Sequence, residues 1–274
     1  IYFDGGSGAS TLRGPNTDAH WEITGTDEGT LQTSNFLEFT NVRNLHGADD
    51  SKDVFLMAAN ASIAGTLDGG LAGDDRLILE GTSHQTVTYS NTGLNSGSVE
   101  RGGHRIDFTG MDIVSDLSTA SEVFIKATND ADVVHLKDAD VNTNGSTTVQ
   151  LSALNQFTFP NPTTSLTIEL FTGDDTFTLE SLDPSIDATI NVVSTGGEDQ
   201  VFGPTLSDPA AVTEWTLRDD GTAEIDLLED SIELSGFETF VGGQSVDRFH
   251  GPDTTTRWVL GQLGAGEVAG ISFA

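Results

Sequence analysis

Residues 166–179 read Leu166-Thr-Ile-Glu-Leu-Phe-Thr-Gly-Asp-Asp-Thr-Phe-Thr-Leu179. Two short runs of alternating apolar residues flank a Gly-Asp-Asp break, which is typical of β-strands joined by a tight turn. No segment has helical periodicity of useful length, and the best candidate, residues 208–214, would make about two turns at most. The sequence therefore predicts an all-β fold. Similar β-branched and aromatic runs begin at Asp53, Arg76, Val123, Val133 and Thr189.

One pattern is written several times along the chain. Trp21, Tyr89, Trp215 and Trp258 each open a copy, and a glycine that begins a returning strand follows six or eight residues later. Two of these copies share a leader, because Gly-Pro pairs at residues 14–15 and 251–252 precede their tryptophans by the same interval. Apolar triplets at i, i+3 and i+6 follow the openers, and a fourth triplet lacks one: Phe39, Val42 and Leu45; Phe108, Met111 and Val114; Leu234, Phe237 and Phe240; Leu151, Leu154 and Phe157.

An acidic turn feeding a strand, Asp-x-apolar, is a second recurrent element. It occurs at Asp53, Asp75, Asp132, Asp175, Asp199 and Asp247, with Ser10 in the same place near the start. Most steps between these positions are close to one or two multiples of about 22 residues, as stacked coils require. We therefore predict a parallel β-helix or β-solenoid of coils of about 22 residues, with extruded aromatic-led hairpins. The step from Asp75 to Asp132 is out of phase, and we interpret residues 89–105 as one such hairpin.

A row of tandem β-sandwich domains is the alternative architecture, because turn signals every 8–12 residues fit it equally well. For the solenoid, the sequence predicts one elongated repeat array over residues 1–274, with both ends cut from a longer chain. Repeat-like copies lie near residues 14–80, 81–202 and 203–250, and a truncated copy lies at residues 251–274.

The charge restricts the partners. The chain has 43 acidic and 11 basic residues, a net charge of −32, so nucleic acid and anionic membrane surfaces are poor partners. Its zero cysteines exclude disulfides and thiolate chemistry. No apolar run approaches the roughly 18 residues of a membrane span.

Glycine-aspartate turns carry a family resemblance. Segments beginning at Gly5, Asp68, Thr172, Gly196 and Gly242 resemble degenerate haemolysin-type (repeats-in-toxin) turns. Together with the aromatic hairpins, they are similar to tandem repeats of giant secreted or surface-attached bacterial adhesin-like proteins. The resemblance implies export, an extracellular array and Ca²⁺ as a candidate ligand, and it implies no reaction.

Calcium binding has a physical basis, since Ca²⁺ takes six to eight oxygen ligands and an acidic Gly-rich turn offers carboxylates and carbonyls. Asp75, Asp175, Asp199 and Asp247 match the ligand position of the motif. The turns recur at about 22 residues rather than every nine, which argues against a continuous calcium ladder. The other interpretation is that each aspartate caps its own turn. The candidate ligands are Asp49, Asp50, Asp53, Asp74, Asp75, Asp130, Asp132, Asp174, Asp175, Asp199 and Asp247.

Enzyme chemistry has little support in the sequence. The six histidines are scattered, and no nucleophile elbow or phosphate loop is present. Arg101 and Arg105, which flank Gly102, Gly103 and His104, form the one basic cluster that a carbohydrate-active β-helix enzyme or carbohydrate-binding module could use. The aromatic openers could stack on sugars if exposed, but their fixed phase favours packing inside the fold.

These observations predict a structural or adhesive segment of a large exported bacterial surface or matrix protein, calcium-stiffened and filament-forming, and not an enzyme. The expected location is extracellular or on the cell surface. Expected partners are further copies of the chain, neighbouring repeats and surface glycans. The alternative is the carbohydrate-active enzyme or binding module built around residues 101–105.

Overall fold

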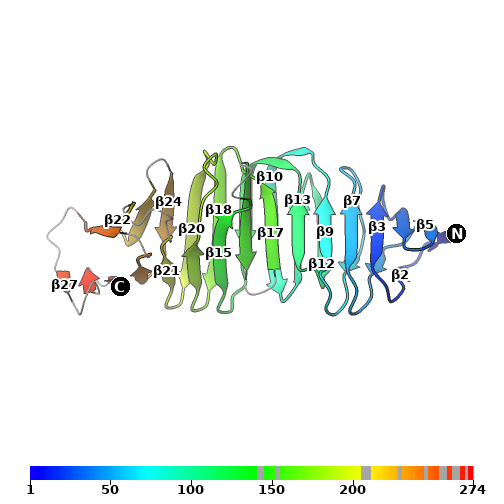
Figure 1. Cartoon of the computed structure of the whole chain (residues 1–274), viewed down its shortest axis with the longest axis horizontal. Helices are drawn as coiled ribbons and strands as arrows, with labels where there is room; N and C mark the ends of the chain where they lie inside the picture. Colours follow the sequence, from blue (N-terminus) through cyan, green and yellow to red (C-terminus); the bar gives the residue numbers. More distant parts are fainter. Residues whose placement is uncertain are drawn as a thin grey trace. The chain divides into compact units, whose positions relative to one another are not determined.

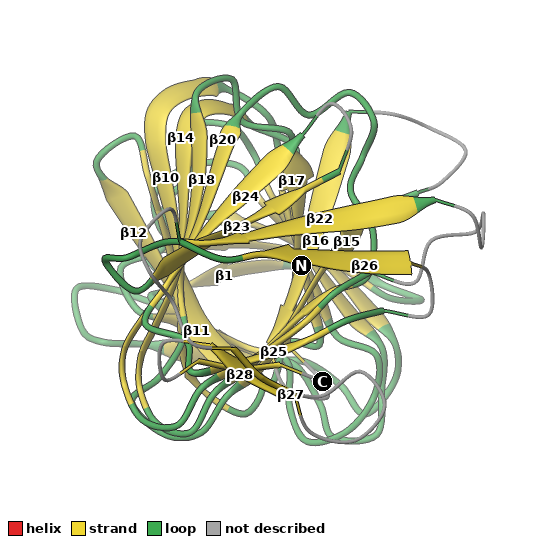
Figure 2. Ribbon diagram, turned by 90° about the vertical axis from the view of Figure 1, so that its left-hand side faces the viewer, coloured by secondary structure: helices red, strands yellow, loops and turns green. Residues whose placement is uncertain are grey.

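The structure is a computed structural model, and it describes residues 1–140, 145–151, 155–204, 211–227, 230–243, 246–252, 258–260, 266–268 and 271–273. In these residues all regular secondary structure is β-strand, which confirms the all-β prediction (Figure 2). Residues 208–210 of the helix candidate lie outside the described residues, and a strand begins at Val212, so the helical alternative is wrong there. No helix in the described part of the chain is long and apolar enough to cross a membrane.

The strands fall into two compact units, residues 1–120 with 153–160 and residues 121–152 with 161–274. In each unit the strands form two sheets. The first sheet of unit 1 has the order β1 (Tyr2–Asp4), β5 (Phe36–Thr40), β4 (Gly29–Gln32), β3 (Ala19–Ile23), β7 (Asp53–Met57), β9 (Arg76–Leu79), β13 (Ile113–Asp116) and β17 (Asn155–Pro160). The second has the order β2 (Thr11–Arg13), β6 (Asn44–His46), β8 (Thr66–Asp68), β12 (His104–Thr109), β11 (Ser96–Arg101) and β10 (Ser83–Gly93).

Unit 2 repeats this arrangement. Its first sheet has the order β16 (Ser146–Leu151), β15 (Val133–Asp138), β19 (Thr176–Leu179), β21 (Gln200–Phe202), β25 (Thr239–Val241), β29 (Ile271–Phe273), β28 (Gly266–Val268) and β27 (Trp258–Leu260). Its second sheet has the order β14 (Thr119–Lys126), β18 (Ser165–Thr172), β20 (Thr189–Gly196), β24 (Ser231–Ser235), β23 (Thr222–Asp226), β22 (Val212–Leu217) and β26 (Val246–His250).

Successive strands pair in parallel with equivalent residues in register. In unit 1, Trp21 of β3 aligns with Phe55 of β7, which aligns with Leu77 of β9 and then with Val114 of β13. Figure 1 shows β3, β7, β9 and β13 side by side. In unit 2, the aligned residues are Val134, Phe177, Val201, Phe240 and Phe273. All of these side chains are buried, so the Asp-x-apolar pattern marks the core-facing residue of each strand.

Each aromatic opener begins a three-stranded antiparallel meander. The meanders are β3–β4–β5, β10–β11–β12, β22–β23–β24 and β27–β28–β29. The predicted hairpin at residues 89–105 is therefore present, but it is not extruded: β12 pairs in parallel with β8 inside the sheet. Insertion satisfies the backbone N–H and C=O groups that a protruding hairpin edge would leave unpaired.

The apolar triplets turn the chain from one strand into the next. Phe39 lies near the end of β5, Val42 lies in the following turn and Leu45 belongs to β6, and all three are buried. The triplets beginning at Phe108 and Leu234 are buried in the same way, whereas Leu154 lies outside the described residues. Each triplet thus packs the turn between two strands against the core.

Aromatic stacking fills the interior between the two sheets of each unit. Trp21 stacks on Phe55 with ring centroids 5.5 Å apart, Tyr89 stacks on Phe159 at 5.3 Å, and Trp215 stacks on Phe249 at 5.3 Å. Trp21 and Trp215 are 0% exposed and Tyr89 is 1% exposed. Packing of these three openers is confirmed, because no ring face is available to a sugar. The side chain of Trp258 lies outside the described residues.

Glycine leaves room for the indole rings. A Cβ atom at Gly203 would lie 2.5 Å from Cζ2 of Trp215, and one at Gly14 would lie 2.9 Å from Cζ2 of Trp21. Gly203 and the proline after it are thus a third Gly-Pro pair that packs beside a tryptophan. The sequence analysis missed this pair, because it lies farther before Trp215 than the other two pairs lie before their tryptophans.

We expect Gly203→Ala to lower the free energy of unfolding by about 1–3 kcal/mol, because the buried indole must shift to accept a methyl group. Gly8→Ala is the matched control, since a Cβ atom there meets no other atom within 4 Å. Urea unfolding of both variants measures the difference. Equal stability of the two would contradict the close packing at Gly203.

Candidate functional site

Five of the predicted acidic positions lie in two columns of carboxylates, one in each unit; these five are buried, whereas the two further members, Asp112 and Glu238, are half-buried and exposed, respectively. In both columns the backbone N–H of one acidic residue donates to the carboxylate of the equivalent residue on the next strand. We call these arrangements carboxylate columns. The carboxylates that accept these bonds therefore hold two strands together, and for Asp75, Asp175 and Asp199 the interpretation that the aspartate caps only its own turn is wrong. The carboxylates of Asp53 and Asp132 accept from their own turns, as that interpretation predicts, and only their backbone N–H groups reach the next strand.

The column of unit 1 consists of Asp53, Asp75 and Asp112. The N–H of Asp53 donates to Oδ1 of Asp75 over 2.7 Å, and the N–H of Asp75 donates to Oδ2 of Asp112 over 2.9 Å. Oδ2 of Asp53 also accepts from the N–H of Ala48 and from the hydroxyl of Ser51, at 2.9 and 3.0 Å. The side chains of Asp53 and Asp75 are buried at the start of β7 and just before β9.

The column of unit 2 consists of Asp132, Asp175, Asp199 and Glu238. The N–H groups of Asp132, Asp175 and Asp199 donate to the next carboxylate in the column over 2.8, 2.7 and 2.8 Å. The three aspartates are buried. Each of the four precedes a strand of the first sheet, so the column follows one edge of the stacked strands.

Asp112 and Glu238 belong to the columns although the sequence analysis did not select them. Both precede an apolar triplet residue by two positions, Val114 in one case and Phe240 in the other. This acid-x-apolar spacing was the available signal. The inserted meanders hide it, because they lengthen the step from Asp75 to Asp112 to 37 residues and the step from Asp199 to Glu238 to 39.

Glycines make room for the column in unit 1. A Cβ atom at Gly47 would lie 2.5 Å from Oδ2 of Asp53, and one at Gly69 would lie 2.8 Å from Oδ2 of Asp75. Both glycines precede their aspartate by six residues. At Gly47 and Gly69, the glycine of the turn before Asp-x-apolar thus has a steric cause.

Burial and like charges raise the pKa of the central carboxyls. The pKa of Asp75 rises to about 7, mainly through burial and further through the charges of Asp53, Asp112 and Asp68, while the hydrogen bond from Asp53 opposes the rise. The pKa of Asp175 rises to about 6, again mainly through burial, with added repulsion from Asp199, Asp132 and Asp174. One carboxyl in each column, Asp75 or Asp175, therefore holds its proton to a higher pH than an ordinary aspartate does.

Oδ2 of Asp175 is buried and has no hydrogen-bond partner among the described residues. An unpaired anionic oxygen in the interior is costly, which agrees with the raised pKa of this carboxyl.

The remaining candidate calcium ligands lie at the surface or partly buried. Asp49, Asp50, Asp74, Asp130 and Asp174 are exposed. Of these, Asp49 accepts from the N–H of Leu71, Asp174 accepts from the N–H of Glu198, and Asp74 pairs with Lys52. Among the described residues no group of three or more His, Cys, Asp or Glu side chains is arranged to hold a metal ion. Calcium binding stays a prediction.

Asp247 is half-buried and has a different role from the column residues. Its Oδ1 accepts from Nε1 of Trp215 over 2.9 Å. In unit 1, Trp21 and Asp53 occupy the equivalent places in the β3–β7 pair, and there Nε1 of Trp21 and Oδ1 of Asp53 are both buried without partners in the described part of the chain. The Trp215–Asp247 bond anchors an aromatic opener to the neighbouring strand.

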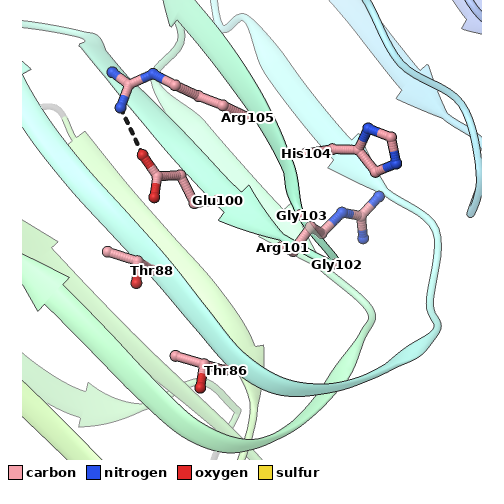
Figure 3. Close-up of a pocket in the computed structure, with 8 residues that line it drawn as sticks. All are labelled: Thr86, Thr88, Glu100, Arg101, Gly102, Gly103, His104 and Arg105. Carbon is pink, nitrogen blue, oxygen red and sulfur yellow. Dashed lines mark hydrogen bonds and ion pairs between the residues drawn. The ribbon is translucent and has the colours of Figure 1, made fainter.

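The basic cluster of the sequence lies at the turn between β11 and β12, beside a cavity of about 330 Å³ (Figure 3). Arg101 is buried. Its Nη1 donates to Oδ1 of Asp116 at 3.1 Å, to the hydroxyl of Ser118 at 2.7 Å and to the carbonyl of Glu80 at 2.9 Å. The hydroxyl of Tyr89 donates to the other oxygen of Asp116 over 3.1 Å. In this network, the buried carboxylate of Asp116 neutralises the charge of Arg101.

Arg105 and the nearby histidines line the outer part of this corner. Arg105 pairs with Glu100 at 2.7 Å, as the dashed line in Figure 3 shows, and with Asp107 at 2.8 Å. His84 is held close by, and burial followed by the charge of Arg101 lowers its pKa. Both arginines are thus matched by carboxylates: Arg101 is buried in its network, whereas Arg105 is 49% exposed and keeps its pairs at the surface.

Comparison of the chain with protein families, with curated proteins and with solved structures finds no match. The class of protein is therefore argued from the stacked strands and the carboxylate columns alone.

Proposed function

We propose that this chain is a β-solenoid segment of a large exported bacterial surface or extracellular-matrix protein, with a structural or adhesive role. The observation that carries the proposal is the repeated parallel register, in which equivalent residues of successive strands align and stack in both units. A stack of this kind gains stability from each added coil, because every coil buries its apolar face on its neighbours.

The carboxylate columns support the same role. Every column bond joins residues on different coils, so it resists sliding of one coil past the next. A typical hydrogen bond within a protein contributes about 0.5–1.5 kcal/mol of net stability. Stiffness along the stack is what a stalk, fibre or matrix element requires.

The outermost strand of unit 1 offers a surface for assembly. β1 pairs with β5 on one side, and β1 is the end of the sheet order within unit 1. Ile1, Tyr2 and Phe36 are exposed there, at 84%, 62% and 51%. An edge strand with exposed apolar side chains is a template for pairing with another chain. This edge is suited to pair with a further coil, whether that coil belongs to a neighbouring repeat or to a second copy of the chain, and we include such pairing in the proposed function.

Sedimentation velocity over a wide range of protein concentration tests this function. We expect concentration-dependent larger species, favoured by salt because salt screens the net charge of −32. Tyr2→Lys places a charge on the edge and should shift the association midpoint to at least about tenfold higher concentration.

Leu117→Lys is the matched control for that experiment, since Leu117 is 58% exposed in unit 1 and the charge change is the same. Association that persists in Tyr2→Lys, or that Leu117→Lys weakens equally, would contradict the edge as the contact. A monomer at all concentrations would contradict the assembly role.

A further inference from the structure

A groove in unit 1 lies between the turn after β8 and the tip of the β10–β11 hairpin. Its volume is about 630 Å³, which lies within the usual range for ligand pockets. It is distinct from the basic corner, because the two cavities have no lining residue in common.

Two leucines on its lining are exposed to solvent. Leu71 in the turn is 76% exposed and Leu94 at the hairpin tip is 68% exposed. They come from segments 23 residues apart in the sequence that the fold brings to one groove. Exposed leucines that converge on a concave surface indicate a contact site, because apolar side chains in water do not contribute hydrophobic stabilisation to the fold.

The charges of the groove have one sign. Asp49, Asp68 and Asp112 line it, and no lysine or arginine does. Asp68 is paired with His46 at 2.7 Å, and Asp49 has one basic neighbour, Arg13, at 3.6 Å. The groove is therefore rich in acceptors and negative charge.

Asn95 joins the hairpin tip to the acidic side of the groove, because its Nδ2 donates to Oδ1 of Asp112 over 2.7 Å. A ligand with a positive charge and several N–H donors would complement the carboxylates that line the groove.

We propose that this groove binds an arginine-containing apolar peptide segment of a partner protein. A guanidinium has five donors and a positive charge that match the acceptors of the groove, and its methylene stem can pack on Leu71 and Leu94. A second copy of this chain is a poor occupant, because a surface of net charge −32 repels the acidic groove.

This inference deepens the proposed adhesive role by naming a partner class, and it rests on that role for its biological use. Its test does not depend on self-association, which sedimentation reports separately. Failure of one experiment therefore leaves the outcome of the other unchanged.

The probe is a fluorescent peptide of alternating leucine and arginine, titrated into the whole chain and followed by anisotropy. A peptide with citrulline in place of arginine keeps the shape and removes the charge. We expect binding of the arginine peptide to be at least about tenfold tighter than that of the citrulline peptide, and to weaken with salt.

Protein variants locate the site. Leu71→Ser with Leu94→Ser should weaken binding by about tenfold or more, and Asp49→Asn should weaken it by about threefold. Leu117→Ser and Asp50→Asn are matched controls, because both side chains are exposed in unit 1 and neither lines the groove. Near-ultraviolet circular dichroism confirms that each variant is folded.

Several results would overturn the proposal. These are equal binding of the citrulline peptide, binding that survives in the double leucine variant, and no binding of the arginine peptide. Displacement of the peptide by millimolar Ca²⁺ at constant ionic strength would assign the groove to the metal ion. Tighter binding of a simple polyamine than of the peptide would assign it to small cations.

Discussion

Arg101→Met is expected to lower the free energy of unfolding of unit 1 by about 3–5 kcal/mol, because it leaves the carboxylate of Asp116 buried without its counter-charge. The side chains of Arg101 and Asp116 are only 4% and 0% exposed, so water cannot replace the lost partner. Ser118 and the carbonyl of Glu80 also lose their shared donor.

The position of Asp116 explains the size of this effect. In the β7–β9–β13 register, Asp116 aligns with Leu79, which aligns with Met57. An acidic residue thus stands where the other coils have core methyl groups, and the salt bridge to the β10–β11–β12 meander neutralises it. Burial and the nearby charge of Asp116 raise the pKa of Tyr89 well above its ordinary value, so its hydroxyl stays a donor.

Arg105→Met is the matched control for Arg101→Met. Arg105 is 49% exposed and its pairs with Glu100 and Asp107 lie at the surface, so its replacement should cost no more than about 1 kcal/mol. Urea unfolding and hydrogen exchange of unit 1 measure both variants.

The double variant Arg101→Met with Asp116→Leu keeps the test decisive if the single variant does not fold. It removes both charges and should be more stable than Arg101→Met alone. Equal losses in Arg101→Met and Arg105→Met, or a double variant less stable than the single one, would contradict a buried ion pair.

The free energy of unfolding is expected to fall as the pH rises from about 4 to about 7, because the carboxyls of Asp75 and Asp175 bind protons more tightly in the folded chain. The folded pKa values are about 7 for Asp75 and about 6 for Asp175, against an ordinary value of 3.8. A raised pKa contributes stability that is complete below the unfolded value and is lost as the pH passes the folded value. Between the two values each group contributes up to about 1.4 kcal/mol per pH unit.

One buried carboxyl acts in the opposite direction. Hydrogen bonds from Ser185, Gly145 and Ser146 outweigh burial and lower the pKa of Asp183, so its contribution is lost as the pH falls through that lowered value. This loss therefore lies below the ordinary value of 3.8 and outside the window of the columns.

Adjacent aspartates provide the controls for the pH experiment. Asp75→Asn and Asp175→Asn should flatten the pH dependence, because each replaces a titrating buried carboxyl by a neutral amide whose oxygen can still accept the column hydrogen bond. Asp74→Asn and Asp174→Asn remove the same charge from exposed side chains and should leave the slope close to that of the unmodified chain. Thermal and urea unfolding from pH 4 to 8 measure all four.

The same experiment tests calcium. Unfolding of chelator-treated chain is repeated with Ca²⁺ and with Mg²⁺ at matched ionic strength, since a ligand that binds only the folded state must raise stability. A calcium-specific rise that Asp75→Asn abolishes would assign the column to calcium instead of protons. Stability that is flat or rising from pH 4 to 7 would contradict the proton interpretation.

Part of the candidate site was visible in the sequence. Asp53, Asp75, Asp132, Asp175 and Asp199 were selected from the Asp-x-apolar spacing, and all five lie in the columns. In the pairs Asp74-Asp75 and Asp174-Asp175, the second aspartate is the buried one. The sequence predicts this, because side chains two positions apart in a strand point to the same face, and Leu77 and Phe177 point into the core.

Other features depend on contacts between distant segments. The sequence has no local signal that Arg101 meets Asp116, because that pair forms only when the β10–β11–β12 meander is inserted into the sheet. The same insertion brings Leu94 to Leu71 and completes the groove. The prediction of an extruded hairpin was wrong for the same reason. Pairing of β12 with β8 satisfies backbone N–H and C=O groups, and this long-range contact leaves no signal in the local sequence.

The sequence by itself determined the all-β class, most strand starts, the aromatic-led hairpins and the recurrence of the apolar triplets, because these follow from short-range alternation and turn chemistry. The tertiary structure alone decided which strands pair, and so which carboxylates stack, which arginine is buried and where exposed leucines meet. Strand pairing is a long-range choice, made by the burial of whole faces and the satisfaction of backbone hydrogen bonds. Local spacing constrains that choice but does not make it.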